Sequence, residues 1–104
     1  MREQRIETLK AMLIENEHDE FALYGLALEY KATGRFEEAL ELLRRAAALE
    51  APQIYTFYQL GEVSIALDEL DEALDALSTG HQRAMSAGDM KAAREFQALI
   101  DTID

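Results

Sequence analysis

The chain has 104 residues, of which 49% are hydrophobic and 30% are charged, so it can bury one modest core and is too apolar to remain disordered. Its formal net charge of −11 argues against nucleic-acid binding, which depends on clustered Lys and Arg side chains that neutralise phosphates. The acidity fits a solvated surface, a source organism with high intracellular salt, or a preference for basic ligands.

The sequence contains no cysteine, which excludes disulfides and thiol chemistry and fits a reducing compartment. Near the N-terminus the longest apolar run is Ala11 to Ile14, far shorter than the core of a signal peptide or a membrane-spanning helix. We therefore expect a cytoplasmic protein that does not associate with membranes.

The hydrophobic spacing predicts helices throughout, because the chain lacks runs of alternating β-branched residues and hairpin dipeptides. A first helix is expected over residues 2–16. Its apolar stripe comprises Ile6, Leu9, Met12 and Leu13. Asp19 is a candidate N-cap for a second helix over residues 20–33. Apolar side chains surround most of that second helix, so we expect it to contact more than one neighbour.

Turn residues divide the remainder of the chain into four further helices. Gly34 and Gly88 provide turns, Asp68 joins two helices, and Pro52 interrupts the pattern. The helices are expected over residues 34–49, 53–67, 69–86 and 88–102. The last one has an apolar face with Ala92, Ala93, Phe96, Leu99 and Ile100, and a solvent-facing side with Lys91, Arg94, Glu95 and Asp101.

An internal repeat with a period of 34 residues relates residues 20–53 to residues 54–87. The seven identities are Tyr24 with Tyr58, Leu26 with Leu60, Ala32 with Ala66, Glu38 with Glu72, Ala39 with Ala73, Leu40 with Leu74, and Leu43 with Leu77. Small residues also occupy equivalent positions in the two repeats. At these positions the two helices of a hairpin can approach each other only if the side chain is very small. The pattern therefore indicates two stacked helical hairpins.

At these positions the chain resembles the tetratricopeptide repeat, a helix-turn-helix unit of 34 residues. The matching residues are Leu23, Leu26, Ala27, Tyr30, Ala39 and Leu43 in one unit, and Phe57, Leu60, Gly61, Ser64, Ala73 and Leu77 in the other. The second unit has Ser64 where the family has an aromatic residue, and neither unit closes with Pro.

The resemblance implies an all-α fold, a right-handed α-α superhelix of about six antiparallel helices in a single domain. Within it we expect an N-terminal half-repeat over residues 1–19, full repeats over 20–53 and 54–87, and a C-terminal capping helix over 88–104. Terminal units are expected to depart from the pattern, because they have a neighbour on one side only.

The resemblance also implies a non-catalytic protein-protein interaction module, in which the first helices of successive hairpins line a concave groove. By the geometry of the family, the groove-facing residues are Phe21, Tyr24, Leu28, Lys31, Tyr55, Tyr58, Gln59 and Glu62. An exposed aromatic patch of this kind commonly marks a binding site. In the alternative interpretation, the aromatic rings bury one another or pack against the first helix.

The expected ligand is a protein or peptide segment of apolar or basic character. Some members of the family grip a C-terminal carboxylate with basic side chains, but the corresponding residues here, Tyr24 and Leu28, are not basic. A competing hypothesis is a self-associating, homodimeric scaffold whose groove or capping helix is occupied by a second copy.

No pattern in the sequence indicates catalysis, a cofactor or a metal site. His18 and His81 lie far apart in the sequence, and neither has a nucleophile at a suitable spacing. The acids near Asp68 begin a helix, where they complement its dipole. Two glycines stand inside helices: Gly80 indicates a close helix contact, and Gly25 leaves room either for a ligand beside Tyr24 or for the N-terminal helix.

Overall fold

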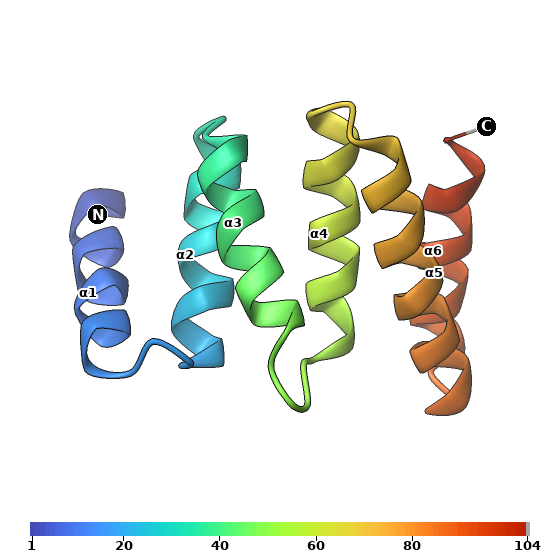
Figure 1. Ribbon diagram of the computed structural model, residues 1–104, viewed down its shortest axis with the longest axis horizontal. Helices are drawn as coiled ribbons and strands as arrows, with labels where there is room; N and C mark the ends of the chain where they lie inside the picture. The colour runs from blue at the N-terminus through green and yellow to red at the C-terminus, as the bar shows by residue number, and fades with distance from the viewer. Residues whose placement is uncertain (104) are drawn as a thin grey trace. The chain divides into compact units, whose positions relative to one another are not determined.

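The computed structural model describes residues 1–103, which form helices joined by short turns and contain no strand (Figure 1). The helices are α1 (Arg2–Glu15), α2 (Glu20–Ala32), α3 (Phe36–Ala47), α4 (Ile54–Ala66), α5 (Leu70–Ser86) and α6 (Met90–Asp101). The all-α prediction is confirmed. Each helix begins and ends within two residues of its expected position.

The chain divides into two compact units, Met1–Pro52 and Gln53–Asp104. In the first unit, α2 packs against both α1 and α3, which confirms that this largely apolar helix has more than one neighbour. In the second unit, α5 packs against both α4 and α6, and α6 also contacts α4.

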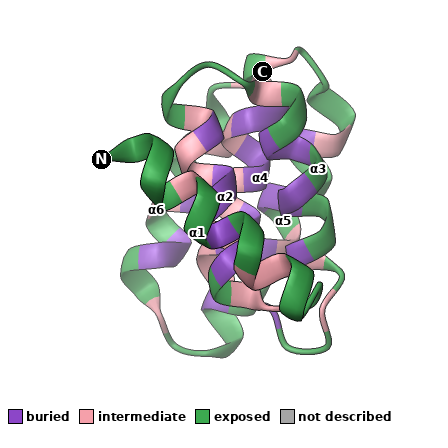
Figure 2. Cartoon of the chain, turned by 90° about the vertical axis from the view of Figure 1, so that its left-hand side faces the viewer, coloured by how far each residue is buried: buried purple, intermediate pink, exposed green. Residues whose placement is uncertain are grey.

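In the first unit, the buried side chains come mainly from α2 and α3. Leu23 and Leu43 are completely buried, whereas Leu9 is the one buried residue of α1. Most of α1 is accordingly exposed, as the green colour of this helix in Figure 2 shows. The first helix therefore contributes less apolar burial than its neighbours, and burial is the dominant stabilising term.

In the second unit, two glycines allow helices to approach closely. A Cβ atom added at Gly61 would lie 2.3 Å from Cδ2 of Leu77, and one added at Gly80 would lie 2.3 Å from Cε1 of Phe96. Neither position has room for a methyl group unless its neighbours move. The prediction of a close helix contact at Gly80 is confirmed.

The helices α2, α4 and α5 each end in the same type of turn. In each turn a backbone N–H beyond the helix end bonds a carbonyl of its last turn: Arg35 to Tyr30 at 2.8 Å, Glu69 to Ser64 at 2.8 Å, and Asp89 to Ala84 at 2.9 Å. The residue before each of these donors has a positive φ. These residues are Gly34 with φ 79°, Asp68 with φ 60° and Gly88 with φ 72°. The pattern is that of a helix C-cap in the left-handed conformation.

Two aspartates cap helix N-termini. The side chain of Asp19 accepts a hydrogen bond from the backbone N–H of Ala22, and Asp89 accepts one from Ala92, both at 3.1 Å. The expected capping role of Asp19 is confirmed. Among residues 1–103, no helix combines the length and the apolar character that crossing a bilayer requires.

Candidate interaction surfaces

The candidate binding residues of the first unit lie along one face of α2. Phe21, Tyr24 and Leu28 follow one another at spacings of three and four, which places them on the same side of the helix. Phe21 is 64% exposed, and Tyr24, Leu28 and Lys31 are half-buried. The core residues Leu23, Leu26, Ala27 and Tyr30 project from the opposite side of α2. Phe21 is therefore an aromatic side chain that the core of this unit does not use.

The corresponding residues of α4 have a different environment, because α6 packs beside them. Tyr55, Tyr58, Gln59 and Glu62 are all half-buried. The ring of Phe96 on α6 lies 5.5 Å from that of Tyr58 in an edge-on arrangement and 6.5 Å from that of Tyr55 in a stacked one. The two tyrosine rings also meet edge-on at 6.1 Å. In the second unit, the two tyrosine rings thus pack on each other, as in the alternative interpretation, and also on Phe96 of the last helix, which neither interpretation included.

A hydrogen bond fixes the edge of this aromatic cluster. The Tyr55 hydroxyl donates to the carboxylate of Glu95, and this bond, together with burial, raises the pKa of Tyr55 to about 12. Burial, followed by the nearby charges of Glu62 and Glu95, also raises the pKa of Tyr58. Glu95, which the sequence places on the solvent-facing side of the last helix, is 40% exposed and is in addition bonded to α4.

The N-terminal helix contacts α2 through an apolar side chain and through ion pairs. A Cβ atom added at Gly25 would lie 3.3 Å from Cδ2 of Leu9, so the glycine admits the one buried side chain of α1. Of the two interpretations offered for Gly25, room for the N-terminal helix is the correct one. In addition, the carboxylate of Glu29, whose side chain is 17% exposed, lies 3.0 Å from Nε of both Arg2 and Arg5.

Acidic and histidine side chains are the candidate metal ligands of this chain. Among residues 1–103, no group of three or more His, Asp or Glu side chains is placed to hold a metal ion. Asp68, Asp71 and Asp75 are exposed. The hydroxyls of Thr56 and Ser64 are buried without a hydrogen-bond partner, at a cost to folding.

Two helical hairpins with a 34-residue period and an additional helix at each end define a helical-repeat protein of the tetratricopeptide type. Residues 6–80 match the sequence profile of the family described as anaphase-promoting complex, cyclosome, subunit 3. Because the match covers most of the chain, the protein belongs to this family of helical repeats.

A comparison with curated proteins found no match. Among solved structures, the chain is similar to the crystal structure of MamA, with a TM-score of 0.69 and 22% sequence identity. The match covers 95% of this chain and 66% of that one, so the present chain spans slightly less than two thirds of the protein it matches. This likeness establishes a shared fold, the α-α superhelix of tetratricopeptide repeats.

Proposed function

We propose that this chain is a non-catalytic protein-binding module whose partner contacts the first helices of its two hairpins. On α2 the contact residues are Phe21, Tyr24, Leu28 and Lys31. On α4 they are Tyr55, Tyr58, Gln59 and Glu62. The observation that carries the proposal is the 64% exposure of Phe21 on a helix whose opposite side already supplies the core.

The chemistry of the α2 residues suits a protein partner. Phe21 offers a large apolar surface, and the neighbouring Tyr24 combines an aromatic ring with a polar hydroxyl, the side-chain types that are enriched at the centres of interfaces. Leu28 extends the apolar strip by one turn. A partner segment with an apolar side chain at this position would remove the Phe21 ring from water, which is favourable.

The electrostatics favour a basic segment over an acidic one. The net charge of −11 attracts cations and repels anions at long range. On α4 the half-buried Glu62 adds a negative charge near Tyr58, whose pKa it helps to raise, and tyrosine hydroxyls can accept or donate hydrogen bonds. We therefore expect a partner segment with apolar side chains flanked by Lys or Arg.

Self-association is the competing function, and solution mass across a dilution series separates the two. We expect a monomer at every concentration, because the proposed surface binds a different protein and not a second copy. The result that would overturn the proposal is a persistent dimer that Phe21→Ser dissociates and that Leu74→Ser leaves intact. Leu74 is the matched control, since it is 43% exposed on α5 and outside the proposed surface.

Phe21 is a better site for this test than the tyrosines of α4. Tyr55 and Tyr58 contact Phe96, so their replacement would also loosen α6. A loss of association in those variants would not distinguish a binding defect from a folding defect. Phe21 is mostly exposed, so its replacement by Ser should leave the helical circular dichroism signal unchanged.

A further inference from the structure

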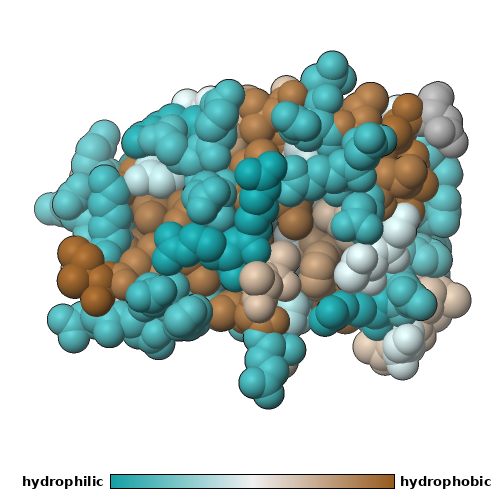
Figure 3. Space-filling model, viewed as in Figure 1, coloured by the Kyte–Doolittle hydropathy of each residue, from teal (hydrophilic) through white to brown (hydrophobic). Residues whose placement is uncertain are grey.

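The first unit has a second apolar surface, on the side of α2 that faces away from Phe21. Here α1 and α3 both pack against α2 and leave an open groove of about 420 Å³. Its floor is formed by Leu26, Tyr30 and Leu42, and its α1 side by Leu13 and Ile14. We call this surface the α1–α3 groove. Figure 3 shows apolar atoms gathered over α1 and in the space between α1 and α3.

Ile14 is the most unusual residue of this groove. Its side chain is 85% exposed at the C-terminal end of α1, although it borders a floor of buried apolar residues. A single exposed isoleucine is ordinary on a protein surface. One that continues a concave apolar floor forms part of a patch, and such patches are typical of binding sites.

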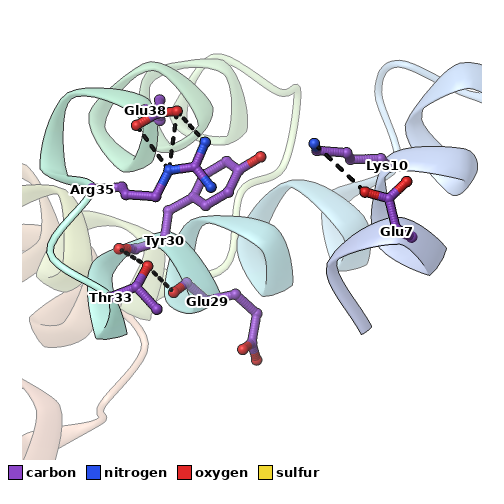
Figure 4. Close-up of polar contacts among 7 residues, drawn as sticks. All are labelled: Glu7, Lys10, Glu29, Tyr30, Thr33, Arg35 and Glu38. Atoms are coloured by element: carbon purple, nitrogen blue, oxygen red, sulfur yellow. Dashed lines mark hydrogen bonds and ion pairs between the residues drawn. The ribbon is translucent and has the colours of Figure 1, made fainter. Parts of the chain in front are cut away.

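Contacts of Arg35 fix two residues of the groove on its α2 and α3 sides. The guanidinium of Arg35 lies over the Tyr30 ring at 4.2 Å from its centroid, and Nε of Arg35 lies 3.1 Å from both carboxylate oxygens of Glu38 (Figure 4). The Arg35 bond also lowers the pKa of Glu38, so this acid stays ionised. A preformed surface loses little conformational entropy on binding.

The charge of the whole chain favours a cationic ligand, whereas the groove lining itself holds two acids, Glu38 and Glu41, and two bases, Lys10 and Arg45. Three of these four side chains have partners within the chain: Glu38 is bonded to Arg35, Nζ of Lys10 lies 3.8 Å from the Glu7 carboxylate, and Arg45 donates to the backbone carbonyl of Glu17 at 3.1 Å. On α3 the acidic Glu41 is exposed at the edge of the groove. The net charge of −11 disfavours an acidic ligand or a second copy of the chain at long range.

We propose that the α1–α3 groove binds a basic amphipathic helix of a partner protein. Apolar side chains spaced three and four residues apart on that helix contact Ile14 and the floor of the groove. Lys or Arg side chains flanking the apolar stripe face Glu41. This binding site is separate from the one proposed for Phe21, because Leu26 and Tyr30 lie on the opposite side of α2.

The probe for this site is a fluorescein-labelled synthetic peptide that forms a helix with Leu along one face and Lys at the other positions. A matched control peptide has Glu in place of every Lys. Fluorescence anisotropy measures the affinity of each peptide for the full chain. We expect the Lys peptide to bind at least about tenfold more tightly than the Glu peptide.

Exposed-residue variants locate the binding site without disturbing the fold. Ile14→Glu should weaken binding of the Lys peptide at least about tenfold, although it makes the protein more acidic. Glu41→Lys should weaken it several-fold. The control Leu74→Glu adds the same charge at an exposed leucine of α5. All of these proteins also carry Phe21→Ser, because the other proposed surface takes a segment of similar chemistry. Leu74→Glu should retain the affinity of the Phe21→Ser parent.

Several outcomes would overturn the proposal. Unchanged binding in Ile14→Glu, or equal binding of the Lys and Glu peptides, would show that the groove does not recognise a basic helix. A loss of affinity in Leu74→Glu as large as that in Ile14→Glu, or no binding of the Lys peptide to the Phe21→Ser parent, would place the peptide elsewhere. A dimer that Ile14→Glu dissociates would identify the occupant as a second copy.

Discussion

Tyr55 is a residue on the surface of α4 whose pKa depends on Glu95, which is far away in the sequence but adjacent in space. Its hydroxyl donates to the Glu95 carboxylate across the space between α4 and α6. Ionisation of the phenol would remove the donated proton and place two negative charges together. This is the reason that the pKa of Tyr55 is raised to about 12.

The first prediction concerns this pKa. Replacing Glu95 by Gln should lower the pKa of Tyr55 toward its ordinary value of about 10, because the negative charge that opposes ionisation is gone. The measurement is the pH dependence of the NMR shift of an isotope-labelled Tyr55 ring carbon. A pKa that stays near its value in the unaltered chain would contradict the assigned hydrogen bond.

The sign of the accompanying stability change follows from linkage. Since the pKa of Tyr55 is higher in the folded state than in the unfolded one, the hydrogen bond stabilises the fold fully below a pH of about 10. That contribution is lost as the pH rises through the folded-state pKa of about 12. The free energy of unfolding, measured with urea, should therefore decrease less between these two pH values in Glu95→Gln than in the unaltered chain.

At the scale of single helices, the sequence predicts the elements well because their signals are local. The side chain of Asp19 caps α2 by bonding a backbone N–H only three residues further along the chain. Gly34 adopts a positive φ, which depends on its own backbone alone. Asp68 adopts the same left-handed conformation one repeat later, at the place where Gly34 stands in the first unit. The 34-residue period relates these two turn positions to each other directly.

Contacts between helices are predicted less well, because they depend on packing that no local pattern encodes. Helical spacing places Glu95 on the solvent side of α6, yet it bonds Tyr55, which is 40 residues away in the sequence. The repeat indicates the eight candidate binding residues, but not the contact between Phe96 and the tyrosines of α4. The α1–α3 groove has no signature in the sequence, because three separate helices contribute to it.

The second prediction uses the two helical glycines as a matched pair. Gly80→Ala should destabilise the protein by about 1–3 kcal/mol, since the new methyl would meet the Phe96 ring at 2.3 Å and Cβ of Phe57 at 2.9 Å. Gly25→Ala should change stability by less than about 1 kcal/mol, in the stabilising direction, because alanine favours the helix. The nearest atom there, Cδ2 of Leu9, is 3.3 Å away and can shift.

Urea unfolding midpoints and slopes measure both glycine variants on the same scale. Equal effects of the two substitutions would contradict the packing, because the contact at Gly80 is much tighter than the one at Gly25. A strongly destabilised Gly25→Ala would show that α1 is held more rigidly against α2 than the single buried Leu9 indicates.

At the scale of the whole molecule, the protein combines a helical-repeat fold with a strongly acidic composition. The family and the structural likeness establish the repeat, and helical repeats serve as interaction modules. The exposed Phe21 and the α1–α3 groove lie on opposite sides of α2, so the two proposed partner segments do not compete for the same side of this helix.

The most direct test of the central claim is photo-crosslinking at Phe21 in the cells that make the protein. A photoreactive phenylalanine analogue replaces Phe21, and the same analogue at Leu74 serves as the control. We predict a discrete adduct between this chain and a different protein from position 21, and none from position 74. No adduct at position 21, or one with twice the mass of the chain, would contradict the account.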